Sequence, residues 1–155
     1  MARIEVGDEA LDFTLAGTEG RSYSLAEHRG EWLILAFYPG DFTPVCTRQF
    51  CSYRDGGDRL ETLRASVLGI SPQSIGSHKR FAERYELTVP LLADPDKRVC
   101  AAYGVLFGGQ VRRSVFIIDS EGIVRYRHSA ILGLSYRDVD HLAEALARAR
   151  EAAPG

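Results

Sequence analysis

Hydrophobic positions along the chain follow two kinds of pattern. Continuous apolar runs at residues 32–38 and 66–71 are typical of strands that are buried on both faces of a sheet. Residues 74–85 and 136–150 instead place apolar side chains at the three- and four-residue spacing of an amphipathic helix. We therefore expect a layered structure in which helices pack against a sheet.

Shorter segments complete the expected order of elements. The turn at residues 17–20 separates two short extended segments, 11–14 and 21–24, which we interpret as an N-terminal β-hairpin. The other expected elements are a helix from residue 43 through 51, a short helix at 96–103, and strands at 89–93, 114–118 and 123–129. The order βαβ followed by αββα is that of a thioredoxin-like fold, an α/β structure with a mixed β-sheet flanked by helices.

Size and charge narrow the possible partners. The chain has 155 residues, 45% of them apolar, and we expect residues 1–155 to form a single domain. Its formal net charge of −2 gives no reason to expect nucleic acid or an anionic membrane surface as a partner. No segment approaches the ~18 apolar residues of a membrane span, and residues 1–8 lack an apolar leader segment. We expect a cytoplasmic protein with a small or neutral substrate.

The segment around Cys46 carries the strongest chemical signal. Thr43 is a residue type that caps helix starts, and Pro44 suits the first helical position. Cys46 then lies in the first helical turn, where free N–H groups and the positive end of the helix dipole stabilise a thiolate. The alternative interpretation is a cysteine that packs against the core.

The run from Tyr38 to Thr47 reads Tyr-Pro-Gly-Asp-Phe-Thr-Pro-Val-Cys-Thr. This run and the order of elements resemble the peroxiredoxins over essentially the whole chain. A second cysteine, Cys51, follows Cys46 by five residues and narrows the resemblance to the peroxiredoxin Q subfamily, also called bacterioferritin comigratory proteins. The resemblance implies a thiol-dependent peroxidase, a monomer or homodimer, that reduces hydrogen peroxide and organic hydroperoxides and is recycled by thioredoxin or a similar dithiol.

The resemblance also implies roles for individual residues. Pro39 shields the pocket, Thr43 donates a hydrogen bond to the thiolate or peroxide, Cys46 attacks, and Cys51 resolves the resulting sulfenic acid as an intramolecular disulfide. From its residue type alone, Thr43 could instead cap the backbone amide of Cys46.

An arginine is expected beside Cys46. The family has the pattern Arg-x-x-Phe-Ile-Ile-Asp, which residues 113–119 match, so the resemblance points to Arg113. Adjacent residues in a strand face opposite sides, so Arg112 and Arg113 would not both face Cys46. A guanidinium group keeps its charge and donates in a fork, which suits a thiolate and the oxygen that leaves during O–O cleavage.

Helix geometry sets a condition on the disulfide. Five residues along an α-helix separate the Cα atoms of Cys46 and Cys51 by roughly 8.6 Å. A disulfide needs Cα atoms within about 7 Å. We therefore predict local unwinding of this helix before the bond forms, made less costly by Gly56 and Gly57.

Other functional classes fit the sequence less well. A thiol–disulfide oxidoreductase typically has a C-x-x-C motif, whereas Cys46 and Cys51 form C-x4-C. A peroxide sensor, or a redox-regulated protein using the same disulfide without rapid turnover, stays open as an alternative. The spacing offers no zinc ligands to complete a site with the two cysteines, and we expect no metal or cofactor.

The remaining cysteine and the histidines suggest structural roles. Cys100 lies among small apolar residues, and we interpret it as a buried structural thiol. The histidines occur at no metal-ligand spacing, and we expect most of them at the surface or on helix faces: they are His28, His78, His128 and His141.

Overall fold

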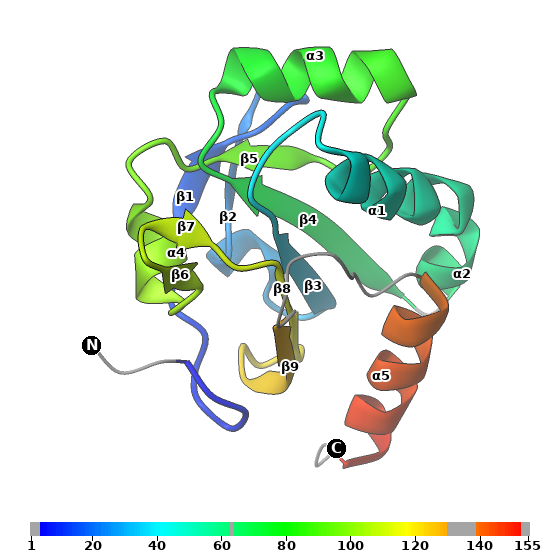
Figure 1. Ribbon diagram of the computed structural model, residues 1–155. Coiled ribbons are helices and arrows are strands. Elements are labelled where there is room, and N and C mark those ends of the chain that lie inside the picture. Colours follow the sequence, from blue (N-terminus) through cyan, green and yellow to red (C-terminus); the bar gives the residue numbers. More distant parts are fainter. Residues whose placement is uncertain (1–3, 63, 130–138, 153–155) are drawn as a thin grey trace.

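The computed structural model describes residues 4–62, 64–129 and 139–152. A five-stranded mixed sheet lies at its centre, with the strand order β5-β4-β3-β8-β9 (Figure 1). The middle strand β3 (Trp32–Phe37) pairs in parallel with β4 (Ala65–Ser71) and antiparallel with β8 (Ser114–Ile118). The edge strands are β5 (Leu91–Ala93) and β9 (Val124–Ser129). The expected mixed sheet is thereby confirmed.

Helices complete the layers around the sheet (Figure 1). Their bounds are Ala26–His28 for the short 3-10 helix η1, Pro44–Asp55 for α1, Gly57–Thr62 for α2, Ile75–Tyr85 for α3, Arg98–Ala102 for α4 and Val139–Ala152 for α5. The first three residues of the last expected helix, 136–138, lie outside the described residues. The short expected helix at 96–103 is reduced to α4, because Lys97 adopts a left-handed conformation with φ 61°.

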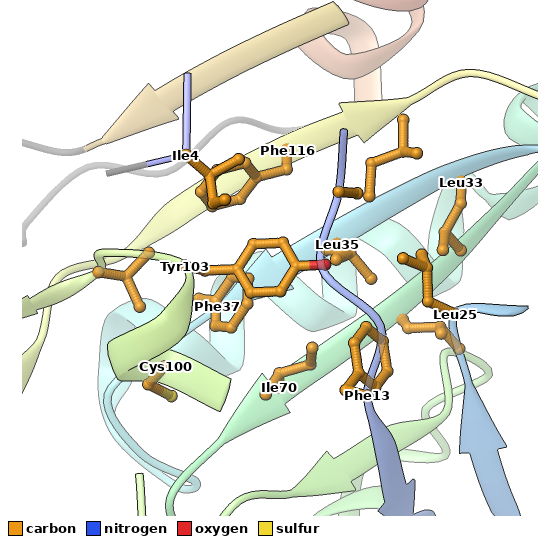
Figure 2. Close-up of a cluster of buried hydrophobic side chains, with 14 of the residues drawn as sticks. Ile4, Phe13, Leu25, Leu33, Leu35, Phe37, Ile70, Cys100, Tyr103 and Phe116 are labelled. Atoms are coloured by element: carbon orange, nitrogen blue, oxygen red, sulfur yellow. The ribbon is translucent and has the colours of Figure 1, made fainter. Parts of the chain in front are cut away.

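The two faces of β3 belong to different hydrophobic clusters, as strand geometry requires. Ile34 and Ala36 pack with side chains of α1, α3 and α5, and we call this side the α1 face. Leu33, Leu35 and Phe37 pack on the other side with the N-terminal segment and α4, and we call it the α4 face. Figure 2 shows the α4 face, where the Tyr103 ring lies 5.3 Å from the rings of Phe37 and Phe116.

Close packing positions α1 on the sheet. The ring of Phe50 in α1 lies over Gly69 in β4, where an added Cβ atom would stand 2.8 Å from the ring. Any larger residue at this position would push α1 away from β4. The position of α1 on the sheet therefore depends on the absence of a side chain at Gly69 in β4.

Two hairpins accompany the sheet. The expected N-terminal hairpin is present as β1 (Thr14–Ala16) and β2 (Ser22–Ser24), although its first strand begins three residues later than predicted. A second hairpin, β6 (Leu106–Phe107) with β7 (Gln110–Val111), was not predicted because two-residue strands show no periodicity. Its turn, Gly108-Gly109, has positive φ at both residues, the signature of a tight hairpin turn.

Among the described residues, no helix combines the length and the apolar character that crossing a membrane would require.

Candidate active site

The loop between β3 and α1 delivers Cys46 to the α1 face. Thr43 has the extended backbone of a residue that precedes a helix, with φ −75° and ψ 148°, and Pro44 takes the first helical position. The predicted helix start is therefore confirmed. The side chain of Thr43 does not cap the helix: Thr43 Oγ1 donates to the carbonyl oxygen of Gly40 at 3.1 Å and so closes the loop on itself.

Cys46 and Arg113 meet at the centre of this face, although 67 residues separate them in the chain. Arg113 Nη1 lies 2.9 Å from Cys46 Sγ, and both residues are buried, with 0% and 4% of their surface exposed. Among the described residues, Arg113 forms no ion pair with a carboxylate. A buried charge requires a partner, and Cys46 Sγ is the contacting atom that is able to carry a negative charge.

Gln49 is a site residue that the sequence reasoning missed. Its Oε1 accepts a hydrogen bond from Arg113 Nη1 at 2.7 Å, and its Nε2 donates to the hydroxyl of Tyr53 at 2.9 Å. Cys46, Gln49 and Tyr53 follow each other at helical positions i, i+3 and i+7, so they share one buried face of α1. That spacing was the available signal, and it places a neutral acceptor where it can orient the guanidinium.

The neighbouring arginine points elsewhere. Arg112 packs over the ring of Phe107 in the β6–β7 hairpin, with its guanidinium carbon 4.6 Å from the ring centre. Both arginines precede β8 instead of lying in it, yet their side chains still contact different parts of the fold. Arg113 is thus the arginine that contacts Cys46.

The two cysteines of the predicted disulfide lie in one unbroken helix. Cys46 and Cys51 are free thiols in α1, the first fully buried and the second partly buried. The helix ends at Asp55, and the chain resumes as α2 after Gly56. An added Cβ atom on Gly56 would stand 2.8 Å from the side chain of Val139, so close packing against α5 explains this glycine.

Cys100 lies in a different hydrophobic cluster from Cys46, and Pro39 lies in the loop that leads into α1. Cys100 is buried on the α4 face, as expected of a structural thiol. Burial raises the pKa of its thiol, and the negative charge of Asp94 raises it further. Pro39 is half-buried in the loop before α1.

One histidine lies on the buried face of a helix. His78 is fully buried in α3, where it pairs with the buried carboxylate of Asp41, whereas the other three histidines are exposed or partly exposed. Tyr38 donates a hydrogen bond to the same carboxylate at 2.7 Å. Burial, followed by the negative charges of Asp41 and Cys46, raises the pKa of the Tyr38 phenol well above its ordinary value. Tyr38 and Asp41 lie in the run of residues 38–47 and His78 lies in an expected helix, but no local pattern indicated that these residues would pair.

The described residues contain no group of three or more histidine, cysteine or acidic side chains placed to hold a metal ion.

The chain is similar to known proteins over most of its length. Residues 6–127 match the model of the AhpC/TSA family. A putative peroxiredoxin of Coxiella burnetii is 42% identical over 129 residues, which cover 78% of this chain and 85% of that protein. Chloroplastic peroxiredoxin Q proteins of rice and wheat are longer, and the chain matches 66% of their length.

Solved structures show the same fold. The peroxidoxin BcpB of Mycobacterium tuberculosis superposes with a TM-score of 0.83 at 31% identity, covering 98% of this chain and all of that one. The bacterioferritin comigratory protein of Xanthomonas campestris, studied for its alkyl peroxide reduction activity, gives a TM-score of 0.79 at 28% identity, covering 97% of this chain and 98% of that one. These neighbours confirm the expected thioredoxin-like fold. The chain belongs to the AhpC/TSA family and is a peroxiredoxin, a thiol-dependent peroxidase of the bacterioferritin comigratory protein and peroxiredoxin Q type.

Proposed function

We propose that Cys46 is the sulfur that attacks the hydroperoxide. The observation that carries this proposal is the contact of 2.9 Å between Cys46 Sγ and Arg113 Nη1 in a buried environment. The thiolate attacks one oxygen of R–O–O–H, a sulfur–oxygen bond forms as the O–O bond breaks, and Cys46 becomes a sulfenic acid. The departing R–O⁻ takes up a proton and leaves as an alcohol, or as water when the substrate is hydrogen peroxide.

Arg113 contributes in two ways in this proposal. Its permanent charge stabilises the thiolate before attack, and its donors stabilise the negative charge that develops on the leaving oxygen. Gln49 holds the guanidinium in place without adding a competing negative charge. Thr43 and Pro39 belong to the loop ahead of Cys46. In this proposal the Thr43 hydroxyl turns from the carbonyl oxygen of Gly40 to donate to the peroxide, and the ring of Pro39 shields the pocket.

The substrates we propose are hydrogen peroxide and organic hydroperoxides. The Xanthomonas campestris relative is described with alkyl peroxide reduction, which supports the organic class for this chain. An aromatic side chain close to the site, Phe42, is 47% exposed and offers apolar surface to an alkyl group.

Cys51 is the proposed resolving thiol. It attacks the Cys46 sulfenic acid, a disulfide forms, and water leaves. Since both residues lie in α1, the segment between them has to unwind first. A thioredoxin-like dithiol would then reduce the disulfide, and we place this cycle in the cytoplasm, in a monomer or homodimer.

Peroxide consumption by single-cysteine variants tests the proposal. Cys46→Ser should abolish consumption, whereas Cys51→Ser should consume one equivalent per chain and form no internal disulfide. Cys100→Ser is the matched control and should turn over like the unaltered protein with thioredoxin and its reductase. Full consumption by Cys46→Ser would refute the proposal, and oxidation of the unaltered protein that stops after one equivalent would indicate a peroxide sensor.

A further inference from the structure

A buried polar cluster lies beside the loop that leads from β3 into α1. The Asp41 side chain is fully buried, and its Oδ1 accepts a hydrogen bond from the Tyr38 hydroxyl at 2.7 Å. Its Oδ2 accepts a second from Ser77 Oγ at 2.7 Å, and His78 Nδ1 lies at the same distance from Oδ2. Tyr38, Asp41 and His78 are buried and Ser77 is partly buried, so the polar groups of the three buried residues have to be satisfied within the protein.

The contacts of His78 determine how many hydrogens the cluster holds. His78 Nε2 lies 3.0 Å from the carbonyl oxygen of Leu92, which can only accept, so Nε2 carries a hydrogen. The Tyr38 hydroxyl also lies 3.3 Å from Nδ1, but it donates its single hydrogen to Asp41 Oδ1 at 2.7 Å. If Nδ1 carried no hydrogen, its lone pair would face the Asp41 carboxylate at 2.7 Å, an arrangement of two acceptors. A hydrogen therefore lies between Nδ1 and Oδ2, and Asp41 and His78 share one proton.

The cluster joins three separate elements. Asp41 belongs to the loop, Ser77 and His78 to the first turns of α3, and the carbonyl of Leu92 to β5. None of these attachment points lies in α1. The loop is thereby anchored to parts of the fold that the proposed unwinding of α1 leaves in place.

The anchored loop contains a strained residue. Phe42, next to Asp41, has a left-handed backbone with φ 64°, which costs a residue with a Cβ atom about 1–2 kcal/mol. Such a conformation persists only where the surroundings impose it. Here the Asp41 contacts hold one side, and the Phe42 ring packs 5.1 Å from Phe81 and 6.3 Å from Tyr85 of α3.

We propose that Asp41 and His78 are positioning residues for the Cys46 reaction. The hydrogen bond that they share holds the loop of residues 39–43 against α3 and β5, and we call this contact the lock. It fixes the position of the first turn of α1, so that Cys46 contacts Arg113. The inference rests on the proposed function of Cys46. Asp41 precedes Cys46 in the chain. The lock therefore keeps the first turn of α1, with Cys46, in place while the turns between Cys46 and Cys51 unwind.

Two substitutions of Asp41 test this positioning role: one removes the side chain's polar group, and the other replaces the carboxylate by an amide. In Asp41→Ala the loop loses its anchor, and we expect the second-order rate of Cys46 oxidation by hydrogen peroxide to fall about 10²-fold. Asp41→Asn should recover most of that loss, because its amide oxygen accepts from Tyr38 and its NH2 group supplies its own hydrogen to His78 Nδ1. The recovery separates positioning from a general need for negative charge.

Asp119→Ala is the matched control. Asp119 is another buried carboxylate, at the far end of β8, where it accepts from the backbone amides of Glu121 and Ile123 and from Arg125. Its loss should lower the melting temperature and leave the rate of Cys46 oxidation unchanged. If Asp41→Ala also lowered the melting temperature but kept the unaltered rate, the cluster would be merely structural and the inference wrong.

The shared proton has its own readout. Nitrogen NMR of the unaltered protein at pH 7.5 should show hydrogen at both ring nitrogens of His78, and Asp41→Asn should show it at Nε2 alone. A bare Nδ1 in the unaltered protein would overturn the inference. If Asp41→Ala does not fold, Tyr38→Phe removes one donor to the carboxylate; an unaltered rate in that variant would also count against the lock.

The Cys46→Ser variant, measured in the same assay, distinguishes the proposed function of Cys46 from the proposed positioning role of Asp41 and His78. Peroxide consumption without Cys46 would refute the proposed function itself. Consumption that depends on Cys46 but is indifferent to Asp41 would refute only the lock.

Discussion

Cys46 and Cys100 are equally buried, at 0% exposure each, but the groups around them carry opposite charge. Arg113 donates to the sulfur of Cys46, whereas the carboxylate of Asp94 lies beside Cys100 and adds to the effect of burial in raising its pKa. Cys46 also lies in the first turn of a helix of 12 residues, and Cys100 in the middle of a helix of five. Under the proposed function, the charge next to a buried thiol, more than its burial, decides whether the thiol serves as a nucleophile.

Arg113→Ala should break the comparison most strongly. Without the guanidinium, Cys46 would become a buried thiol with no cation beside it, much like Cys100. We expect the rate of Cys46 oxidation by hydrogen peroxide to fall about 10²- to 10³-fold, the effect of losing a donor to a developing oxyanion. Stopped-flow measurement checks this, with Arg112→Ala as the control that should keep its rate. Equal losses in both variants would contradict the assignment of Arg113.

Gln49→Glu should weaken the contrast without removing the arginine. The new carboxylate would compete with the Cys46 thiolate for the charge of Arg113. We expect alkylation of Cys46 by iodoacetamide at pH 7 to slow about tenfold, which corresponds to roughly 1.4 kcal/mol. The pH at which alkylation reaches half its maximal rate should move upward. Thr47→Ser, on the same helix but outside the Arg113 contact, should leave the profile in place.

Alkylation of the folded protein should show the difference between Cys46 and Cys100 directly. Because burial and Asp94 raise the pKa of Cys100, its thiol stays protonated and unreactive at pH 8, the reverse of what a nucleophile needs. Mass spectrometry after a short iodoacetamide pulse should therefore find label on Cys46 and Cys51 and none on Cys100. Unfolding in guanidinium should make all three react alike. Early label on Cys100 in the folded protein would contradict this.

Cys100→Ser should have the smallest effect on activity and a measurable effect on stability. The hydroxyl would replace a sulfur packed in the core of the α4 face, and burying it without a good partner costs about 1–3 kcal/mol. Urea unfolding should record this loss, and peroxide turnover should stay at its unaltered level. Cys100→Ala separates the effect of polarity from that of lost volume.

The sequence predicts the elements with continuous patterns well. The segment that becomes β8 has the expected bounds, and the apolar run that becomes β3 ends one residue early, at Phe37, because buried strands require nearly uninterrupted apolar residues. The start of α1 follows from Pro44 at the first helical position. The strand expected at 89–93 begins only at Leu91, because Pro90 has no amide hydrogen for a ladder.

The missed parts of the site depend on contacts between distant segments. Gln49 acquires its role only when Arg113 is folded against α1, 64 residues away in sequence. His78 reads as an ordinary position on an amphipathic helix until the loop brings Asp41 to it. Periodicity and local motifs describe neighbours along the chain, so they do not reveal pairs of polar groups that become neighbours on folding.

The alternation of side chains along β3 has a consequence for the fate of an oxidised sulfur. Cys46 and Cys100 lie in clusters on opposite sides of the central sheet, and side chains of β3 fill the space on both sides. The sheet thus separates the two cysteines: a sulfenic acid on Cys46 cannot contact the thiol of Cys100 while the strands stay paired. In a variant without Cys51, the sulfenic acid of Cys46 would have to react with a thiol from solution. A disulfide between Cys46 and Cys100 would indicate that the strands of the sheet had separated.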